Sequence, residues 1–210
     1  MALTLAADAS VTVPEHRLHV IESRPVLVLR RFDRDAGGRL GYLSAMSMLQ
    51  AKEGEQASYL DIAQALEERS SDAAADLREL WRRIVFTVLI SNIDDHLRNH
   101  GFLRKSTAGW SLSPAFDLNP NPDGAARHLA TAIDENNAQA SLATALEVAD
   151  LFRVSEVQAR DIVREVSDAT ARWRDVARTM GVGDQQLERL EPAFEHERSA
   201  AAREFAATRS

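Results

Sequence analysis

The sequence predicts an α+β chain that is mainly helical and carries short β-hairpins near its N-terminus. Segment 15–21 alternates polar and apolar residues, and segment 26–32 is rich in apolar residues. The turn sequence Glu22-Ser23-Arg24-Pro25 separates them, so together they predict a β-hairpin. From Leu77 to Leu89 the apolar residues recur at i, i+3, i+4 and i+7, the spacing of a buried helix face. Most later segments show the same helical spacing and begin with Ser or Asp, which are common helix caps.

Composition bounds the kind of protein that these segments build. The 210 residues suit a single domain, 1–210, with 45% hydrophobic and 27% charged residues, as in soluble globular proteins. The net charge of −7 disfavours direct binding to nucleic acid or to an anionic membrane. No apolar run approaches the ~20 residues that cross a bilayer, and the N-terminus lacks the positive flank of a signal peptide. With no cysteine in the chain, we expect a cytoplasmic protein.

The N-terminal half is expected to begin with a short helix over 2–10, which Val13-Pro14 ends. The hairpin of 15–32 follows and runs into a charged loop at 33–38. Residues 43–51 are apolar enough for a buried helix.

The remaining helices are predicted from their caps. Ser58 and Asp61 have the spacing of a capping box, and Ser71 or Asp72 caps the long helix that contains Leu77. Ser141 begins a helix that extends to about Leu151. A single helix is expected from Ser155 to about Met180, and another from Asp184 to about Phe205, kinked or split at Pro192. The stripe expected to pack along the first of these two is Val157, Ile162, Val163, Val166, Trp173, Val176 and Ala177.

The stretch from Ser91 to His100 concentrates the reactive side chains of the chain. It follows the long apolar helix and holds the adjacent carboxylates Asp94 and Asp95 together with two imidazoles and two carboxamides. Behind it, 101–103 and 110–112 read as the strands of a hairpin. After that hairpin Asp117 again places an acid among apolar residues.

This layout fits the chemistry of phosphoryl transfer. In protein kinases an Asp accepts the proton of the attacking hydroxyl, an Asn five residues later holds Mg²⁺, and a second Asp beyond a hairpin also binds the metal. Asp94 and Asn99 are five residues apart, and Asp117 follows the hairpin. Asp95 has no Asn at that offset, so Asp94 is the better candidate for the base.

The sequence of residues 92–99, Asn-Ile-Asp-Asp-His-Leu-Arg-Asn, together with Phe-Asp-Leu-Asn-Pro at 116–120, closely resembles the HipA family. These are serine/threonine kinases of bacterial toxin–antitoxin systems. The resemblance implies the C-terminal lobe of a HipA-type kinase fold, ATP and Mg²⁺ as cofactors, and Asp94 as the catalytic residue. It implies Asn99 and Asp117 as metal ligands, and it assigns nucleotide binding to Arg30, Phe32, His96, Asn99, Phe116 and Asp117. Segment 30–34 resembles the family's hinge, whose backbone contacts adenine.

The resemblance also implies partners. A kinase of this family acts on a protein substrate and is neutralised by a DNA-binding antitoxin, so association with DNA would be indirect. Neither direct nucleic-acid binding nor membrane binding is expected.

Two other functions fit the same residues. Asp94, Asp95, His96 and His100 could ligate a metal in a hydrolase, because His96 and His100 would share a face of a helix. Gly101 follows at once, however, and no Glu lies between the two imidazoles to act as a base. The chain could also be a non-catalytic helical module derived from the kinase, which binds a partner and retains Asp94 and Asp117 without using them.

The resemblance covers only the later part of the family's usual length, and we expect the N-terminal lobe to be absent. That lobe carries the nucleotide-gripping loop and the phosphate-binding Lys. The chain has no glycine-rich phosphate loop, and its two lysines, Lys52 and Lys105, are not on an early strand. No spacing places Arg104, Lys105 or Arg127 on the phosphates instead. We therefore expect this chain alone to bind Mg-ATP weakly and to turn over slowly or not at all.

Overall fold

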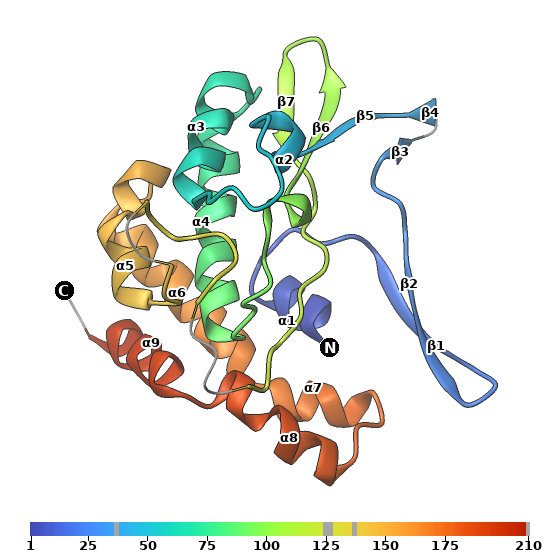
Figure 1. Cartoon of the computed structure of the whole chain (residues 1–210). Helices are drawn as coiled ribbons and strands as arrows, with labels where there is room; N and C mark the ends of the chain where they lie inside the picture. Colours follow the sequence, from blue (N-terminus) through green and yellow to red (C-terminus); the bar gives the residue numbers. More distant parts are fainter. Residues whose placement is uncertain (36–37, 124–127, 136–137, 209–210) are drawn as a thin grey trace.

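The computed structural model describes residues 1–35, 38–123, 128–135 and 138–208. A helical body carries a small sheet on one side and a separate hairpin that extends away from it (Figure 1). The elements of the first half are α1 (Ala2–Asp8), β1 (His16–Ile21), β2 (Arg24–Leu29), β3 (Arg34–Asp35), β4 (Gly38–Arg39), β5 (Gly41–Ser44), α2 (Ala45–Met48), α3 (Tyr59–Arg69) and α4 (Ala73–Leu89). Those of the second half are the 3₁₀ turn η1 (Leu97–Asn99), β6 (Gly101–Ser106), β7 (Gly109–Leu112), α5 (Leu142–Glu147), the 3₁₀ turn η2 (Ala149–Phe152), α6 (Glu156–Ala171), α7 (Trp173–Thr179), α8 (Asp184–Phe194) and α9 (Glu197–Ala207).

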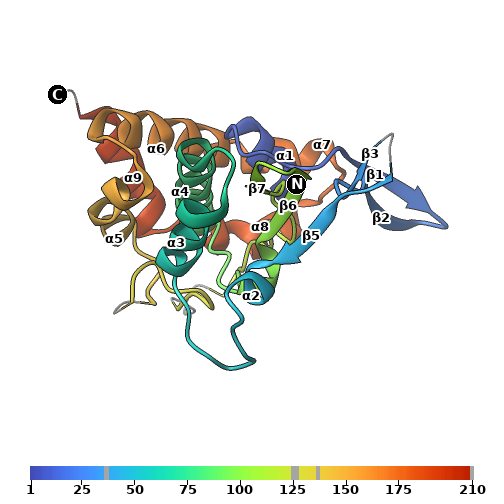
Figure 2. The same cartoon turned by 90° about the horizontal axis from the view of Figure 1, so that it is seen from above.

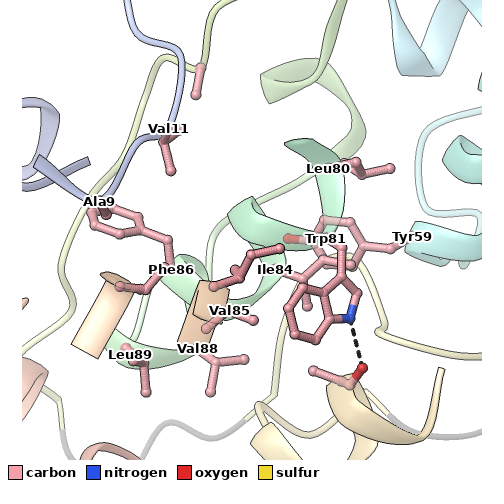
Figure 3. Close-up of a cluster of buried hydrophobic side chains, with 14 of the residues drawn as sticks. Ala9, Val11, Tyr59, Leu80, Trp81, Ile84, Val85, Phe86, Val88 and Leu89 are labelled. Carbon is pink, nitrogen blue, oxygen red and sulfur yellow. Dashed lines mark hydrogen bonds between the residues drawn. The ribbon is translucent and has the colours of Figure 1, made fainter. Parts of the chain in front are cut away.

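Helix α4 is the central element of the body. Its C-terminal half, from Ile84 onward, is buried on every side, because α3, α5, α6 and β7 surround it (Figures 1 and 2). Figure 3 shows Trp81, Ile84 and Phe86 within this core, with the Trp81 Nε1–H donating to the carbonyl of Ala145 at 2.8 Å. An indole buried in this way needs a partner for its N–H, and α5 supplies it. The packing around the end of α4 therefore fixes the position at which the loop beginning with Ser91 leaves the helix.

The predicted hairpin at 101–112 is confirmed, and it belongs to a three-stranded antiparallel sheet in the order β5-β6-β7. Strand β5 pairs with β6 from Gly41 opposite Arg104 to Ser44 opposite Gly101. The predicted helix over 43–51 is therefore largely wrong, since Leu43 and Ser44 belong to β5 and only Ala45–Met48 is helical. Pairing with a strand almost 60 residues away decides this, and local apolar content cannot reveal it.

Gly101 starts β6 directly after the reactive stretch and has no room for a side chain. A Cβ at this position would lie 2.5 Å from Cε2 of Tyr42 and 2.6 Å from the Ser113 hydroxyl. Any side chain at this position would therefore have to displace the Tyr42 ring and the Ser113 hydroxyl, which glycine avoids.

The hairpin of β1 and β2 is confirmed as well, with a turn of two residues, Glu22 and Ser23, both at positive φ (48° and 63°). Two such residues match the twist of a tight hairpin. Arg24 and Pro25, expected in the turn, belong to β2. Every residue from Arg17 to Leu29 is exposed, and the ribbon projects from the body in both views (Figures 1 and 2).

The caps at Ser58, Asp72, Ser141 and Ser155 are confirmed, but two predicted long helices are each divided. The first breaks at Arg172 into α6 and α7, so that Trp173 can stack on Phe194 of α8 at 4.9 Å between ring centroids. The second breaks after Phe194, two residues beyond Pro192, which itself lies within α8.

Val157, expected in the packing stripe of α6, is 67% exposed, so that expectation was wrong. In the described parts of the chain no helix is both long and apolar enough to cross a bilayer.

Candidate functional site

The loop that joins α4 to β6, residues 90–100, carries most of the predicted site residues. It leaves the helix through Ser91, which is buried and adopts a positive φ of 53°. Its only helical part is η1, so His96 and His100 do not share a helix face. Asp94 is exposed, whereas Asp95, Asn99 and His100 are buried.

Asp94 and Asn99 are linked within this loop. The Asn99 Nδ2 donates to the carbonyl of Asp94 at 3.2 Å, and the His96 N–H donates to the same carbonyl at 3.0 Å. Because the amide is planar and Nδ2 is used in this bond, Oδ1 of Asn99 is the amide atom that remains available as an acceptor. The side-chain amide of Asn99 is thus tied to the backbone of Asp94, whose carboxylate is exposed.

Asp95 is buried and makes its contacts with other buried side chains. Its Oδ2 accepts a short hydrogen bond from the hydroxyl of Tyr59 and a long one, 3.4 Å, from that of Thr87, and its Oδ1 lies 3.3 Å from Nε2 of His100. Burial alone would raise the pKa of Asp95, but the charge of His100 and the hydrogen bonds to the carboxylate outweigh burial and lower it below 3.8. No local sequence pattern marks Tyr59 as a partner of Asp95, because the two are 36 residues apart.

Asp117 lies in the loop after β7 and is exposed. It has a positive φ of 56°, which is uncommon for a residue with a side chain, and its Oδ1 accepts a hydrogen bond from Nδ2 of Asn119 at 2.8 Å. Asn119 thus orients this carboxylate. Strained backbone held in place by its surroundings is a frequent feature of functional sites.

Three contacts hold the loop of Asp117 against the rest of the body. The buried Arg83 of α4 donates to the carbonyl of Ser113 at 2.7 Å, and the Ala115 N–H donates to the carbonyl of Thr12 at 2.7 Å. Further on, the Asn121 N–H donates to the carbonyl of Ser91 at 3.3 Å. This last bond joins the loop of Asp117 to the start of the loop that carries Asp94 and Asn99.

An aromatic cavity lies next to Asp117. The ring of Phe116 stacks on that of Phe32 at 5.6 Å, and Phe32 lies 6.2 Å from the ring of Tyr42. The cavity has a volume of about 320 Å³ and is lined by Pro14, Leu29, Arg30, Arg31, Phe32, Asp33, Tyr42 and Phe116. Stacked rings with a few polar groups at the rim suit a flat, partly polar ligand.

The charged residues at the rim of this cavity are paired. Arg31 binds Asp33 through two hydrogen bonds of 2.9 and 2.7 Å, and the bond from Arg31 lowers the pKa of Asp33 well below its usual range. Arg30 is exposed and reaches Glu15 at 3.4 Å, while its backbone N–H donates to the carbonyl of Glu15. Tyr42 and Pro14 belong to the cavity although no sequence pattern marked them.

The structure therefore gathers the predicted residues into two adjoining groups. Arg30, Phe32 and Phe116 line the cavity, and Asp117 follows Phe116 directly. Asp94 and Asn99 share the loop that Asn121 joins to the Asp117 segment. His96 does not line the cavity; it is half-buried, and its Nδ1 has no hydrogen-bond partner in the described structure.

The geometry does not support the metal hydrolase. Among the described residues, no three His, Asp or Glu side chains come close enough together to hold one metal ion. His100 and Asp95 face each other in the interior, whereas Asp94 is exposed and His96 is half-buried.

The structure also gives no support for phosphate binding by Arg104, Lys105 or Arg127. Arg104 lies 5.7 Å above the ring of Trp110. Arg127 and the side chain of Lys105 lie outside the described residues.

Solved kinases share this fold. HipA of Shewanella oneidensis, from a structure with HipB and operator DNA, matches 100% of this chain and 57% of its own, with a TM-score of 0.74 at 15% identity. The Helicobacter pylori proinflammatory kinase CtkA matches 98% of this chain and 84% of its own, with a TM-score of 0.64 at 16% identity. At these identities the similarity shows the kinase-like fold alone.

Two curated proteins are similar in sequence over part of the chain. A Haemophilus influenzae protein named "Putative kinase" is 28% identical over 109 residues, which are 46% of this chain and 32% of the relative. "Putative kinase Y4dM" of Sinorhizobium fredii is 32% identical over 95 residues, which are 44% of this chain and 23% of the relative. The matched regions span about a third or less of these curated relatives.

The family described as HipA-like C-terminal domain matches residues 1–173. That match contains both acidic loops, the aromatic cavity and the whole of α4. The chain belongs to the HipA-like C-terminal domain family.

Proposed function

We propose that this chain is the larger lobe of a HipA-type serine/threonine kinase and that it binds Mg-ATP between its two acidic loops and the aromatic cavity. The observation that carries the proposal is the hydrogen bond from the Asn121 N–H to the carbonyl of Ser91, 3.3 Å long. It joins the loop of Asp117 to the loop of Asp94 and Asn99. The three residues that phosphoryl transfer requires thereby belong to one connected unit.

The donor set suits magnesium. Mg²⁺ prefers oxygen ligands and is usually held by one or two carboxylates together with the phosphates of the substrate. Asp117 offers a carboxylate oriented by Asn119, and Asn99 offers an amide oxygen while its Nδ2 binds the Asp94 carbonyl. Bound magnesium would bridge phosphate oxygens and neutralise the charge that develops on them.

The remaining tasks fall to side chains of this chain. The exposed Asp94 carboxylate would accept the proton of the substrate hydroxyl, while the rings of Phe32 and Phe116 would hold the adenine in the cavity. The backbone of segment 30–34 would hydrogen-bond the edge of the base. His96 does not line the cavity, so we assign it no contact with the nucleotide.

Catalysis is proposed to need a further lobe, supplied by the same gene product or by another chain. Among the described residues near the cavity, no lysine is placed to reach the nucleotide phosphates, which kinases grip from a second lobe. Seven apolar side chains of the β1–β2 ribbon are exposed where such a lobe would dock: Leu18, Val20, Ile21, Val26, Leu27, Val28 and Leu29. A two-stranded ribbon of this kind is marginally stable without a partner.

The nucleotide site is tested by the thermal shift of the full chain with ATP and Mg²⁺. We expect a small shift, which Asp117→Ala abolishes. Asp168→Ala, the loss of an exposed carboxylate on α6, should leave the shift unchanged. An Asp117-independent shift, or no shift at any nucleotide concentration, would contradict the proposal.

Phosphoryl transfer is tested with the chain joined to the preceding lobe, where one exists. Asp94→Asn should then lower the rate of phosphorylation by about 10²–10⁴-fold, the usual contribution of a general base, with little change in nucleotide affinity. Unchanged rates would remove Asp94 from the mechanism.

The partners proposed are a protein substrate and a DNA-binding antitoxin, since HipA of Shewanella was solved with HipB and operator DNA. Any contact with DNA is proposed to pass through the antitoxin, because the chain carries a net charge of −7. Co-purification with a neighbouring helix-turn-helix protein would support this, and Asp94→Asn should not affect it.

A further inference from the structure

A buried polar cluster lies directly behind the loop that carries Asp94 and Asn99. Its members are Tyr59 from α3, Thr87 from α4, and Asp95 and His100 from the loop itself, and each is at most 3% exposed. The carboxylate of Asp95 contacts the other three, and the ring of His100 meets that of Tyr59 edge-on at 5.4 Å. Three separate parts of the chain thus converge on one carboxylate.

The two loop members flank the proposed site residues in sequence. Asp95 follows Asp94, and His100 follows Asn99. Since Asp95 and His100 face each other at 3.3 Å, they close residues 95–100 into a loop whose two ends are held together inside the protein. Asp94 and Asn99 lie immediately before these two ends.

A second anchor fixes the other side of Asp94. The carbonyl of Ile93 accepts a hydrogen bond from the Ala130 N–H at 2.8 Å, and the carbonyl of Ala132 accepts one from the Tyr59 N–H at 2.8 Å. Tyr59 therefore supports Asp94 twice: through its hydroxyl to Asp95, and through its backbone to the segment that holds Ile93. The exposed Asp94 is the free residue between two fixed neighbours.

Packing alone does not explain a carboxylate at this position. Burying a charge costs several kcal/mol unless it is paired, and apolar residues of similar volume often fill such a site at no loss of stability. What a charged acceptor with several donors supplies is a single orientation of the groups around it. Asp95 is too deeply buried to touch a substrate, so its effect must pass through the loop.

We propose that Tyr59, Asp95 and His100 form a positioning unit that holds Asp94 and Asn99 in the geometry for phosphoryl transfer. The inference rests on the proposed function, because it gives that site its rigid support. None of the three is a catalytic residue, since none reaches the nucleotide or the substrate.

The test compares Tyr59→Phe and Asp95→Asn with Trp81→Phe in the full chain. Trp81→Phe is the matched control, because it removes a buried hydrogen bond from another fully buried aromatic residue on the α5 side of the core. Two quantities are measured: the affinity for Mg-ATP from thermal shifts over a series of nucleotide concentrations, and amide hydrogen exchange in 93–100.

Both cluster variants should weaken Mg-ATP binding about tenfold or more, the usual loss when the support of a metal ligand is removed. They should also speed exchange in 93–100. Trp81→Phe should lower the melting temperature without either effect. The double variant Tyr59→Phe/Asp95→Asn should be little worse than the poorer single variant, because the two residues act through one contact.

The outcomes separate this inference from the proposed function. If the wild-type chain shows no Asp117-dependent binding of Mg-ATP, both the proposed function and the positioning role are overturned. If wild type binds and both cluster variants bind equally well with unchanged exchange in 93–100, the positioning role alone is overturned. His100→Gln, which keeps a donor toward Asp95, should fall between wild type and Asp95→Asn, and an effect larger than that of Asp95→Asn would also contradict the inference.

Discussion

The two long hairpins of this protein have the same antiparallel form and opposite surroundings. β6 pairs with β5 and β7 lies against α3 and α4, and Phe102, Leu103 and Leu112 are buried. In the β1–β2 ribbon, the apolar residues of both strands are exposed. Leu18 and Val20 share one face with Leu27 and Leu29, because opposed residues in a strand pair lie on the same side.

The difference shows that a hairpin sequence specifies strands without specifying what covers them. The buried hairpin takes the chain from one acidic loop to the other, so its position determines where Asp117 lies relative to Asp94. The exposed ribbon leads to segment 30–34 and the cavity, and it is free to meet another lobe. Substitutions in and around each hairpin test this difference.

The largest effect is expected at Phe102 in the buried hairpin. Phe102→Ala would leave a cavity between the sheet and the core, and it should lower the free energy of unfolding by about 3–5 kcal/mol. Denaturant unfolding measures this directly. A loss below about 1 kcal/mol would mean that this hairpin is no better packed than the exposed one.

A smaller loss is expected from Gly101→Ala, at the junction of the reactive loop and β6. The added methyl group would overlap the Tyr42 ring and the Ser113 hydroxyl, at a cost of about 1–3 kcal/mol. Because the ring of Tyr42 also lines the cavity, we expect weaker nucleotide binding in the same variant. Gly183→Ala, which meets no neighbouring atom at the N-cap of α8, is the control: it should cost only what an alanine costs at a helix N-cap and leave nucleotide binding unchanged.

The pH dependence of stability should likewise arise in the helical body. Burial, with a further contribution from Arg198, lowers the pKa of His196 from 6.5 to about 4. As the pH falls below 6.5, the unfolded chain therefore takes up a proton before the folded one, and stability is lost down to about pH 4. His196→Gln should flatten this slope in urea unfolding, whereas His19→Gln on the exposed ribbon should leave it unchanged.

The smallest effect is expected on the ribbon itself. Val20→Thr and Val28→Thr keep the β-branched shape at exposed positions, so unfolding of the chain alone should change by about 0.5 kcal/mol or less. The same substitutions should weaken the association with a separately supplied lobe. A large loss of stability in the isolated chain would show that the ribbon already packs against the body.

The sequence determined much of the candidate site. The five-residue spacing of Asp94 and Asn99, and the hairpin before Asp117, are local features that survive in the structure because caps, turns and helical periodicity act within a few residues. For the same reason the capping residues at Ser58, Asp72 and Ser155 were predicted correctly, and so were both hairpins.

Tertiary structure decided what depends on residues far apart in the chain. The pairing of β5 with β6 converted part of a predicted helix into a strand, and packing of Trp173 on Phe194 accompanies the break between α6 and α7. The roles of Tyr59, Arg83, Tyr42 and Asn121 could not be predicted, because each acts on a partner 30 or more residues away. The spacing to Asn99 favours Asp94 over Asp95 as the base, but only the tertiary structure exposes Asp94 and buries Asp95, and so gives Asp95 its proposed supporting role.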